Sequence, residues 1–405
     1  MNQLFKMAFR DLGRNRRRTF FSALAVGVGL MLLVLMSAVI NGEMGSAVEK
    51  SIHLQSGHIQ VRSATYDENK NSLKWEDLVE NPDQIATQIA ALPPVAAATP
   101  RLFASGFLST GNESSGVRIY GIDPASTAND PYRNGLLSGS FLTADDTGGL
   151  LIGQPAASRL RLKVGDNVSL SVNTANGNVD EQTFTIRGIF STGTYGFDNA
   201  TILMPLAKVQ ALTQTQNHAS TIFVLLKDTS ATESVIAALT SSTLKVVTWR
   251  DLNPLIVEFE TMAQSYIAMF YMIILAITAS VIINTLIMSV YERTREIGIL
   301  AAIGMRGGGI MGLFLAESSL LAVGGVILGV ILGLGAVSLF NLNGFYIGKM
   351  GLSGMLISDT IYAKLAVNDL IRLSITTFIV TLLAGLYPAI MASRLEPVAA
   401  LRAEK

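Results

Sequence analysis

The feature that most constrains the fold is an apolar run without a formal charge over residues 265–290. A helix needs about 20 residues to cross a hydrocarbon core roughly 30 Å thick, so this run is long enough to span a membrane once. It breaks at Glu292, Arg293, Arg295 and Glu296, and apolar residues then resume up to Gly304. A helix over 289–304 would place Glu292 and Glu296 four residues apart. Beside them, Leu300 and Ile303, with Ile297 or Ile299, would form a modest apolar stripe. Such a helix suits either a membrane surface or a groove on another protein.

Three further apolar runs cover residues 20–40, 310–340 and 370–392; the first has no formal charge, the second contains Glu317 and the third contains Arg372. Half of the chain is apolar and only 15% is charged, which is typical of a membrane protein with a substantial polar domain. The first run is too long for the apolar part of a typical signal peptide, so we expect it to be retained. The sequence therefore predicts four transmembrane helices, with the second at 264–290.

The charges predict the topology. Arginines crowd residues 1–19 directly before the first span, which favours a cytoplasmic basic N-terminus over a nucleic-acid site. Four spans then place residues 41–263 and 341–369 outside the cytoplasm. The loop 291–309 and the tail 393–405 lie inside. This predicts a multi-pass protein of the inner or plasma membrane with both termini cytoplasmic.

Residues 41–263 have the composition of a soluble domain with strands and helices. Alternating apolar residues predict strands at 58–62, 117–122, 167–172, 181–190 and 221–226. Asn81 and Pro82 predict a helix start, with Asn81 as the N-cap and Pro82 in the first turn. Further helices are expected at 205–212 and 232–239. The second span is expected to continue an amphipathic helix that begins before Gln264. The predicted fold class is four transmembrane helices with a large α+β domain inserted between the first and second.

The sequence contains no recognisable catalytic or metal-binding motif. Cysteine is absent, His53 and His58 are spaced awkwardly for one helical face, and we expect them to be polar surface residues rather than metal ligands. No serine elbow and no phosphate-binding loop of the G-x-x-x-x-G-K-[ST] type occurs. We therefore predict no catalytic, cofactor or metal site, and a chain that is not itself an enzyme.

Polar and small residues inside the spans predict helix packing. Gly325, Gly329 and Gly333 repeat every four residues, so they share one face where another helix backbone can approach closely. Asn284 is expected to form a hydrogen bond across a helix interface. Glu317 is expected to reach the membrane surface or to pair with Arg306, and Pro388 to kink or end the fourth span.

Three segments resemble one family. The sequence YERTREIGILAAIG from Tyr291, the segment LLIGQPAASRLRLKVGDNVSLSV from Leu150 and the tail YPAIMASRLEPVAALR from Tyr387 are similar to FtsX-type ABC-transporter permeases. This superfamily, the type VII ABC transporters, includes LolC, LolE and the permease half of MacB. The resemblance covers the first span, a MacB-like periplasmic core domain, the loop after the second span and the tail.

The resemblance implies a mechanism and partners. Two permease subunits, identical or paralogous, would pair with two separate ABC ATPase subunits, which bind the ATP. ATP-driven movement would pass to the outer domain for lipoprotein release, export or efflux, with lipoprotein, lipid, peptide or antibiotic as the substrate. The short helix after the second span would contact the ATPase through residues of the matching motif: Glu292, Arg293, Arg295, Glu296, Ile297, Gly298, Leu300 and Gly304. Two alternatives remain at this point, an FtsX-like regulator of cell-wall hydrolases and a membrane-anchored sensor.

Overall fold

The computed structural model describes residues 2–67, 72–111, 113–239, 244–347 and 358–396. It divides into two compact units, which we describe separately. The first contains residues 1–43, 261–345 and 361–405, and the second contains residues 44–260 and 346–360. The predicted tail signature extends beyond residue 396, and that part lies outside the described residues, as does most of the loop between the third and fourth spans.

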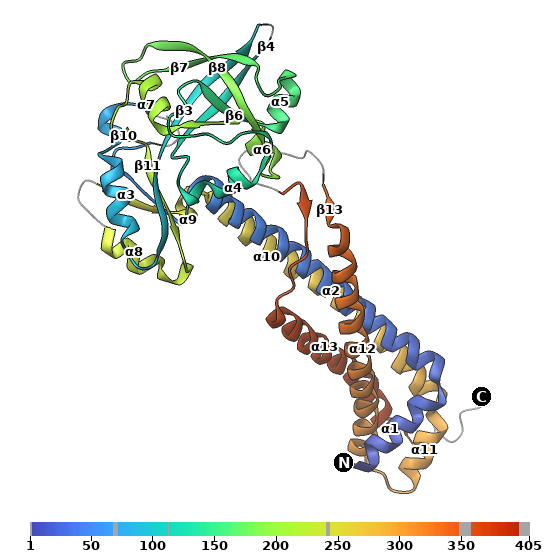
Figure 1. Cartoon of the computed structure of the whole chain (residues 1–405). Coiled ribbons are helices and arrows are strands. Elements are labelled where there is room, and N and C mark those ends of the chain that lie inside the picture. The colour runs from blue at the N-terminus through green and yellow to red at the C-terminus, as the bar shows by residue number, and fades with distance from the viewer. Residues whose placement is uncertain (1, 68–71, 112, 240–243, 348–357, 397–405) are drawn as a thin grey trace. The chain divides into compact units, whose positions relative to one another are not determined.

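The first unit is helical (Figure 1). Four of its helices are long and apolar enough to cross a membrane, as the sequence predicted. A short helix precedes the first long helix, and another lies between the second and third. In chain order the helices are α1 (Asn2–Arg14), α2 (Arg16–Lys50), α10 (Pro254–Glu292), α11 (Thr294–Ala302), α12 (Gly307–Asn343) and α13 (Val367–Ser393).

The helix boundaries differ from the predicted ones in instructive ways. Helices α2 and α10 extend well past their apolar runs, because polar residues on either side keep helical backbone hydrogen bonds. The helix predicted over 289–304 is interrupted at Arg293, whose φ is −110°, so that α11 starts separately from α10. Pro388 lies inside α13, which continues to Ser393, so the proline does not end the helix.

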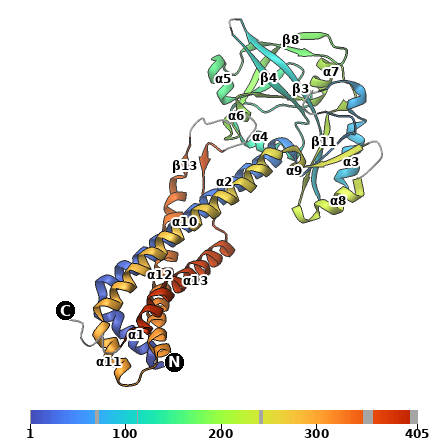
Figure 2. The ribbon, with the colours of Figure 1, turned by 180° about the vertical axis from the view of Figure 1, so that it is seen from behind.

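Helices α2 and α12 pack closely along the three predicted glycines. A β-carbon built on Gly325 would lie 2.5 Å from the β-carbon of Val26, and one built on Gly329 would lie 2.7 Å from that of Leu30. Gly333 faces Val34 in the same way, at 3.1 Å. On its other side α2 approaches α10, with which it runs side by side (Figure 2), because Gly29 leaves room for Thr278. Small residues thus bring both neighbours close to α2.

The second unit is built on a mixed sheet with helices on its faces. Its strands are β1 (Ile59–Ser63), β2 (Val79–Glu80), β3 (Val95–Thr110), β4 (Glu113–Ile122), β5 (Leu136–Gly139), β6 (Gly149–Gly153), β7 (Asn167–Asn173), β8 (Val179–Phe190), β9 (Thr201–Pro205), β10 (His218–Ala219), β11 (Thr221–Leu226) and β12 (Leu244–Thr248). Its helices are α3 (Pro82–Ala90), α4 (Asp130–Asn134), α5 (Gln154–Leu160), α6 (Tyr195–Asp198), α7 (Leu206–Thr213), α8 (Thr232–Leu239) and α9 (Trp249–Leu252). Short strands β13 (Phe345–Tyr346) and β14 (Thr360–Ile361) pair with each other.

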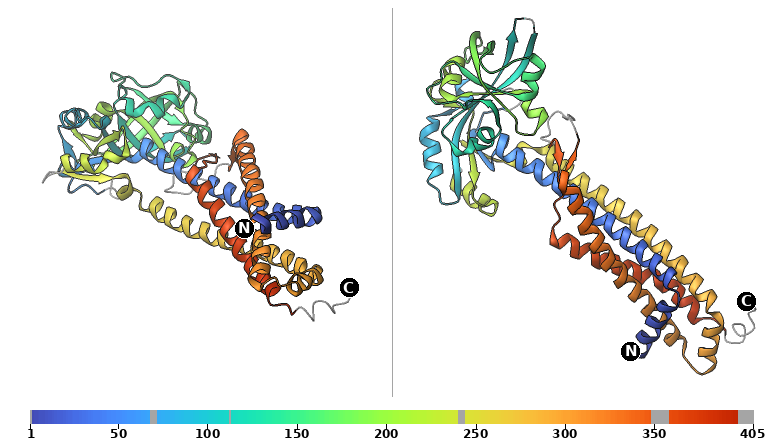
Figure 3. Two further views of the ribbon diagram at one scale, coloured as in Figure 1. Left: turned by 90° about the horizontal axis from the view of Figure 1, so that it is seen from below. Right: turned by 45° about the vertical axis from the view of Figure 1, so that its right-hand side comes forward.

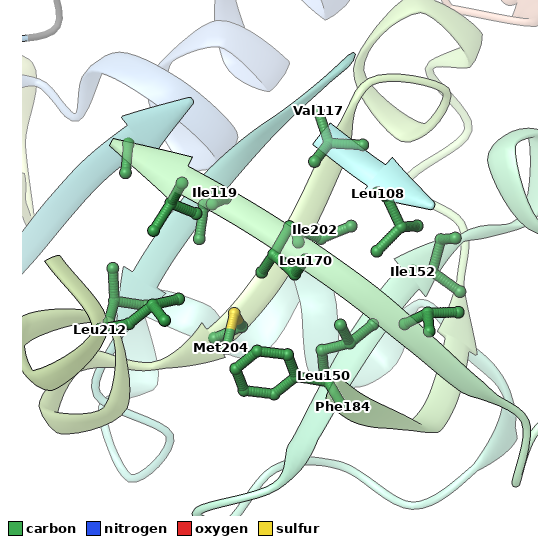
Figure 4. Packing of buried hydrophobic residues seen from close by; sticks show 14 of the residues in the cluster. Leu108, Val117, Ile119, Leu150, Ile152, Leu170, Phe184, Ile202, Met204 and Leu212 are labelled. Carbon is green, nitrogen blue, oxygen red and sulfur yellow. The ribbon is translucent and has the colours of Figure 1, made fainter. Parts of the chain in front are cut away.

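The long strand β3 joins two lobes of this unit. Residues 95–101 pair with β11, which continues through β1 to β12, and helices α3 and α8 contribute to the core of that lobe. Residues 102–110 pair with β4, and the ladder β3-β4-β9-β6-β8-β7 returns to β3, so these strands form a closed barrel. Figure 4 shows the barrel core, where Leu170, Ile202 and Phe184 interdigitate. Closure leaves these strands without a free edge.

Each strand predicted from alternation is present, within a few residues at its ends. The N-cap predicted at Asn81, in contrast, is not formed. Pro82 does occupy the first turn of α3, but Asn81 has a left-handed backbone and makes no side-chain cap. Its side-chain oxygen instead accepts a hydrogen bond from Asn217, at 2.7 Å. The contact between the two loops replaces the local cap.

Residues 51–56 form a π-helix, η1, directly after α2. Ser51 donates a hydrogen bond to the side chain of Asn253, which lies just before α10, at 2.9 Å. Within the second unit, the end of the first long helix and the start of the second are therefore linked.

Candidate functional site

The segment between α10 and α12 combines a short helix with a cluster of charges. Helix α11 begins after Arg293 and ends before Gly304, whose φ of +98° is left-handed and favours glycine. One side of α11 is buried, since Ile297 packs with Val290 and Phe314, and Gly298 lies beside it. The packing fixes α11 against the ends of α10, α12 and α13.

The opposite side of α11 is exposed. Arg295 and Ala302 are exposed, Ile299 is 48% exposed and Ile303 is 76% exposed. These positions recur at the spacing of one helical face, so an arginine and two isoleucines form a single outward strip, which we call the α11 face. A strip of this kind is suited to a groove on a partner protein.

Arg293 is the centre of the charge cluster. Its guanidinium reaches three carboxylates from three elements: Nε lies 3.1 Å from Glu296, Nη1 lies 2.5 Å from Glu317 of α12, and Nη2 lies 2.5 Å from Asp11 of α1. The Arg293 side chain is only 9% exposed. Burial by itself would lower the pKa of Arg293, but the carboxylates of Glu317 and Asp11 raise it instead.

The two predicted glutamates of the motif are also paired within the chain. Glu292 accepts a hydrogen bond from Arg18 at 2.5 Å, and Glu296 accepts one from Arg14 at 2.7 Å. Although partial burial works in the other direction, hydrogen bonds from Arg14 and Arg293 lower the pKa of Glu296. Both carboxylates pair with basic residues around the junction of α1 and α2 and remain partly exposed to solvent, at 43% for Glu292 and 44% for Glu296.

Helix α1 lies against this site (Figure 3). Ala8 is completely buried against Leu313 and Ala316 of α12, and Leu300 of α11 packs on the same cluster. Phe5 and Phe9 face outward, at 44% and 72% exposure. One side of α1 therefore packs on α11 and α12, and the other side exposes Phe5 and Phe9 together with the basic residues Lys6 and Arg10.

The structure separates the eight predicted motif residues into three groups. Arg295 and Gly304 are exposed. Glu292 and Glu296 are occupied by ion pairs within the chain. Arg293, Ile297, Gly298 and Leu300 contact other parts of the same unit. Ile299 and Ile303 were expected in the apolar stripe of this helix but not as contacts of the ATPase, and Ala302, which completes the α11 face, was not predicted.

Two predicted polar contacts are different in the structure. Glu317 pairs with Arg293 and not with Arg306, because the break at Arg293 turns that side chain toward α12. Asn284 lies on an exposed side of α10 and has no hydrogen-bond partner among the described residues. The expected bond of Asn284 across a helix interface is therefore not formed within the described part of this chain.

A cavity of about 600 Å³ lies in the first unit among α2, α10 and α13. Apolar side chains such as Leu33 and Leu275 form one part of its wall, and Asn41, Asp369 and Arg372 form another. Asn41 donates a hydrogen bond to Asp369 at 2.7 Å. The cavity thus offers an apolar surface next to charged groups. In the described ranges no group of three or more potential metal ligands occurs.

Comparisons with known proteins match both units. Residues 19–242 match the family model of the MacB-like periplasmic core domain, and residues 268–397 match that of the FtsX-like permease C-terminal region. The first match alone covers more than half of the chain. The chain belongs to the MacB/FtsX family of permeases. Its fold is therefore that of a multi-pass inner-membrane ABC-transporter permease with a periplasmic core domain, which confirms the predicted family and fold class.

Individual relatives of this MacB/FtsX permease differ in how much they share with it. The lipoprotein-releasing system transmembrane protein LolC of Neisseria meningitidis is 24% identical over 95% of this chain and 94% of its own length. The macrolide export ATP-binding/permease protein MacB of a Shewanella species is 25% identical over 99% of this chain, which spans 60% of that relative. The crystal structure of the periplasmic region of MacB from Actinobacillus actinomycetemcomitans is 17% identical, with a TM-score of 0.36 over 52% of this chain and 97% of that structure.

Proposed function

We propose that this chain is the membrane subunit of an ABC transporter that is driven by a separate ATPase, and that the α11 face is where the ATPase binds. The observation that carries the proposal is the two-sided character of α11. Ile297 and the ion pairs of Arg293 fix one side of α11 to the helical bundle, while Arg295, Ile299 and Ile303 are exposed on the other side. Because α11 is fixed to the bundle on one side and exposed on the other, movement of an ATPase bound to its exposed face would be transmitted to the bundle.

The need for a separate ATPase is supported by the sequence given. It contains no G-x-x-x-x-G-K-[ST] loop, which P-loop ATPases use to hold phosphates. This permease would therefore depend on ATP bound by another chain. In the proposed complex, two ATPase subunits serve two permease subunits.

The proposed orientation has α11 and both termini in the cytoplasm. Basic residues gather at one end of the bundle. Arg14 ends α1, and Arg16, Arg17 and Arg18 begin α2. Arg293, Arg295 and Arg306 lie at the same end, next to α11. Positive residues that flank spans favour the cytoplasmic side. The second unit would then face away from the cytoplasm.

The second permease subunit is proposed to pack on α10. This is the least buried of the four long helices, and its exposed side carries Asn284 between Ile277 and Met288. An amide on an otherwise apolar membrane helix is unfavourable against lipid, whereas across a helix interface it can form a hydrogen bond. A second copy or a paralogue would supply that partner.

Release of lipoproteins is the proposed task, with efflux of another amphiphile as the second candidate. The LolC relative, a lipoprotein-releasing protein, matches this chain over nearly the full length of both. The cavity among α2, α10 and α13 joins an apolar wall to Asp369 and Arg372, a combination that suits a molecule with a lipid part and a polar part.

Affinity purification in mild detergent tests this proposal. The tagged full-length chain should retain a small ABC ATPase in stoichiometric amount, and the complex should hydrolyse ATP. Exchanging two residues of the α11 face together, Arg295→Glu and Ile299→Asp, should abolish retention. The control Arg10→Glu reverses an exposed arginine of α1 and should retain the ATPase. Absence of any ATPase from a folded, membrane-inserted chain would reject the transporter assignment and favour a sensor.

A further inference from the structure

Three separate elements meet at one side chain at the base of the helical unit. Arg293 lies between α10 and α11, and it bonds to Asp11 of α1, to Glu317 of α12 and to Glu296 of α11. Arg293 is 9% exposed; the side chain of Asp11 is nearly as buried, at 12%, and that of Glu317 is more buried, at 3%. A buried charge without a partner is strongly unfavourable, so these groups stabilise one another only while all three elements stay together.

The geometry requires arginine. Three different nitrogens of Arg293 serve the three carboxylates, which approach the planar guanidinium from different sides. A lysine ammonium is a compact point charge on a flexible stem and cannot hold the same three groups in fixed directions. Arg293 therefore fixes orientation as well as charge balance.

Apolar packing holds the same three elements together. Ala8 of α1 is fully buried against Leu313 of α12, and Leu300 of α11 joins that cluster. Outside it, Arg14 pairs with Glu296 and Arg18 pairs with Glu292, so residues at the end of α1 and the start of α2 hold both ends of the Arg293 segment. Helix α1 is thus packed into the bundle beside α11, and it is not only a membrane-surface segment.

We propose that Arg293 is a positioning residue that makes α1, α11 and the start of α12 one mechanical unit, with Asp11 as the contact that includes α1. This inference rests on the proposed function, in which a partner ATPase pushes on α11. The N-terminal helix then moves together with α11, and loss of the Asp11 contact uncouples ATP turnover without removing the ATPase. The ATPase binds the α11 face, and the ion pairs of Arg293 make α1 and the start of α12 move together with α11.

The absence of cysteine makes the position of α11 measurable in the full-length chain. Ile297 is 3% exposed, so an Ile297→Cys chain should react slowly with a polar maleimide. In that background, Asp11→Asn and Arg293→Lys should raise the labelling rate on the order of tenfold, because a weakened buried ion pair permits local opening. Asp11→Glu keeps the carboxylate and should restore slow labelling. Arg10→Gln, at the exposed neighbouring position, is the matched control and should leave labelling unchanged.

ATP hydrolysis by the copurified complex separates positioning from general stability. Asp11→Asn should retain the ATPase but lower kcat by about threefold or more, as expected for residues that modulate coupling, with KM for ATP unchanged. Asp11→Glu should restore kcat. If Asp11→Asn and Arg293→Lys leave both labelling and kcat at wild-type values, or if Arg10→Gln changes them equally, the inference is wrong.

The same variants distinguish failure of the inference from failure of the proposed function. If no ATPase copurifies with the unsubstituted chain, the proposed function fails, and the labelling rates still decide whether Arg293 and Asp11 position α11. Conversely, Arg295→Glu should reduce ATPase retention with Ile297→Cys labelling unchanged. A rise in labelling for Arg295→Glu equal to that for Arg293→Lys would show that Arg293 has no special role.

Discussion

The guanidinium of Arg101 donates a hydrogen bond to the backbone carbonyl of Leu54 at 2.9 Å, deep inside the second unit. Arg101 is fully buried on β3, and Leu54 lies in the π-helix that directly follows α2. The Arg101 side chain also donates to Asn129 and lies over the ring of Phe223, 3.4 Å from its centre. The end of the first long helix is thus anchored in the core of the periplasmic domain by one cation.

Replacing Arg101 should destabilise this domain selectively. Arg101→Met leaves the side chain of Asn129 without its buried donor, which should lower the free energy of unfolding by about 2 kcal/mol and Tm by about 6 °C. Both tryptophans, Trp75 and Trp249, lie in the second unit, so their fluorescence reports its unfolding. The control Lys163→Met changes an exposed cation of the same unit and should leave the fluorescence transition in place. Equal transitions for both variants would contradict the anchoring role.

The packing of α2 on α12 predicts that alanine substitutions at two glycines of α12 differ strongly in their effect on stability. Gly329→Ala would place a methyl group 2.7 Å from Leu30, and overpacking of this kind should destabilise the bundle by about 1–3 kcal/mol. Gly335→Ala, six residues later in α12, faces open space and should be tolerated. The half-life of the folded protein in a denaturing detergent, followed by gel mobility, measures the difference. Similar half-lives would show that α2 and α12 are not packed in this way.

A second pair of glycines, Gly42 and Gly45, tests the packing of the C-terminal part of α2. A β-carbon at Gly42 would lie 1.9 Å from the backbone oxygen of Tyr362, and backbone atoms cannot give way as a flexible side chain can. Gly42→Ala should therefore separate α2 from the segment before α13 and lower resistance to limited proteolysis near Tyr362. Gly45→Ala meets no atom within 4 Å and serves as the control on the same helix. Equal cleavage of the two variants would exclude the close contact.

His58 should make the periplasmic domain less stable in acid. Its Nδ1 accepts a hydrogen bond from the backbone N–H of Leu226, and burial, followed by the nearby His53, lowers the pKa of His58. A lowered pKa means that folding favours the neutral ring, so this contribution is full above the ordinary value of 6.5 and is lost as the pH falls below it. Urea unfolding followed by tryptophan fluorescence should show this loss, and His58→Gln should reduce it. An unchanged pH dependence in His58→Gln would assign the effect to other groups.

Periodicity explains which parts of the fold the sequence could predict. The four spans follow from long apolar runs with at most one charge each, and β7 and β8 follow from alternation that matches their burial. Strand β11 was also predicted, but every residue of it is buried, so its burial does not alternate. Strand β3 was not predicted, because Pro100 and several alanines interrupt its pattern at the point where it passes from one lobe to the other. Asn81 failed as an N-cap because its partner, Asn217, is far away in sequence.

The candidate site was predictable in place and only partly in detail. The charged motif after α10 located α11, but spacing alone could not show that Glu292 and Glu296 face Arg18 and Arg14. These contacts join residues more than 270 positions apart, so no local pattern reports them. For the same reason, the pairing of Glu317 with Arg293 required the folded bundle.

Cysteine crosslinking to the ATPase tests the central claim most directly. Because the natural chain has no cysteine, Ile299→Cys on the α11 face and Ile297→Cys on the buried side provide a matched pair only two residues apart. In membranes that contain the complex, a short crosslinker that joins cysteine to lysine should attach the Ile299→Cys chain to the ATPase and leave the Ile297→Cys chain free. Crosslinking from neither position, in a complex that still retains its ATPase, would show that the partner binds elsewhere and would contradict the proposed coupling through α11.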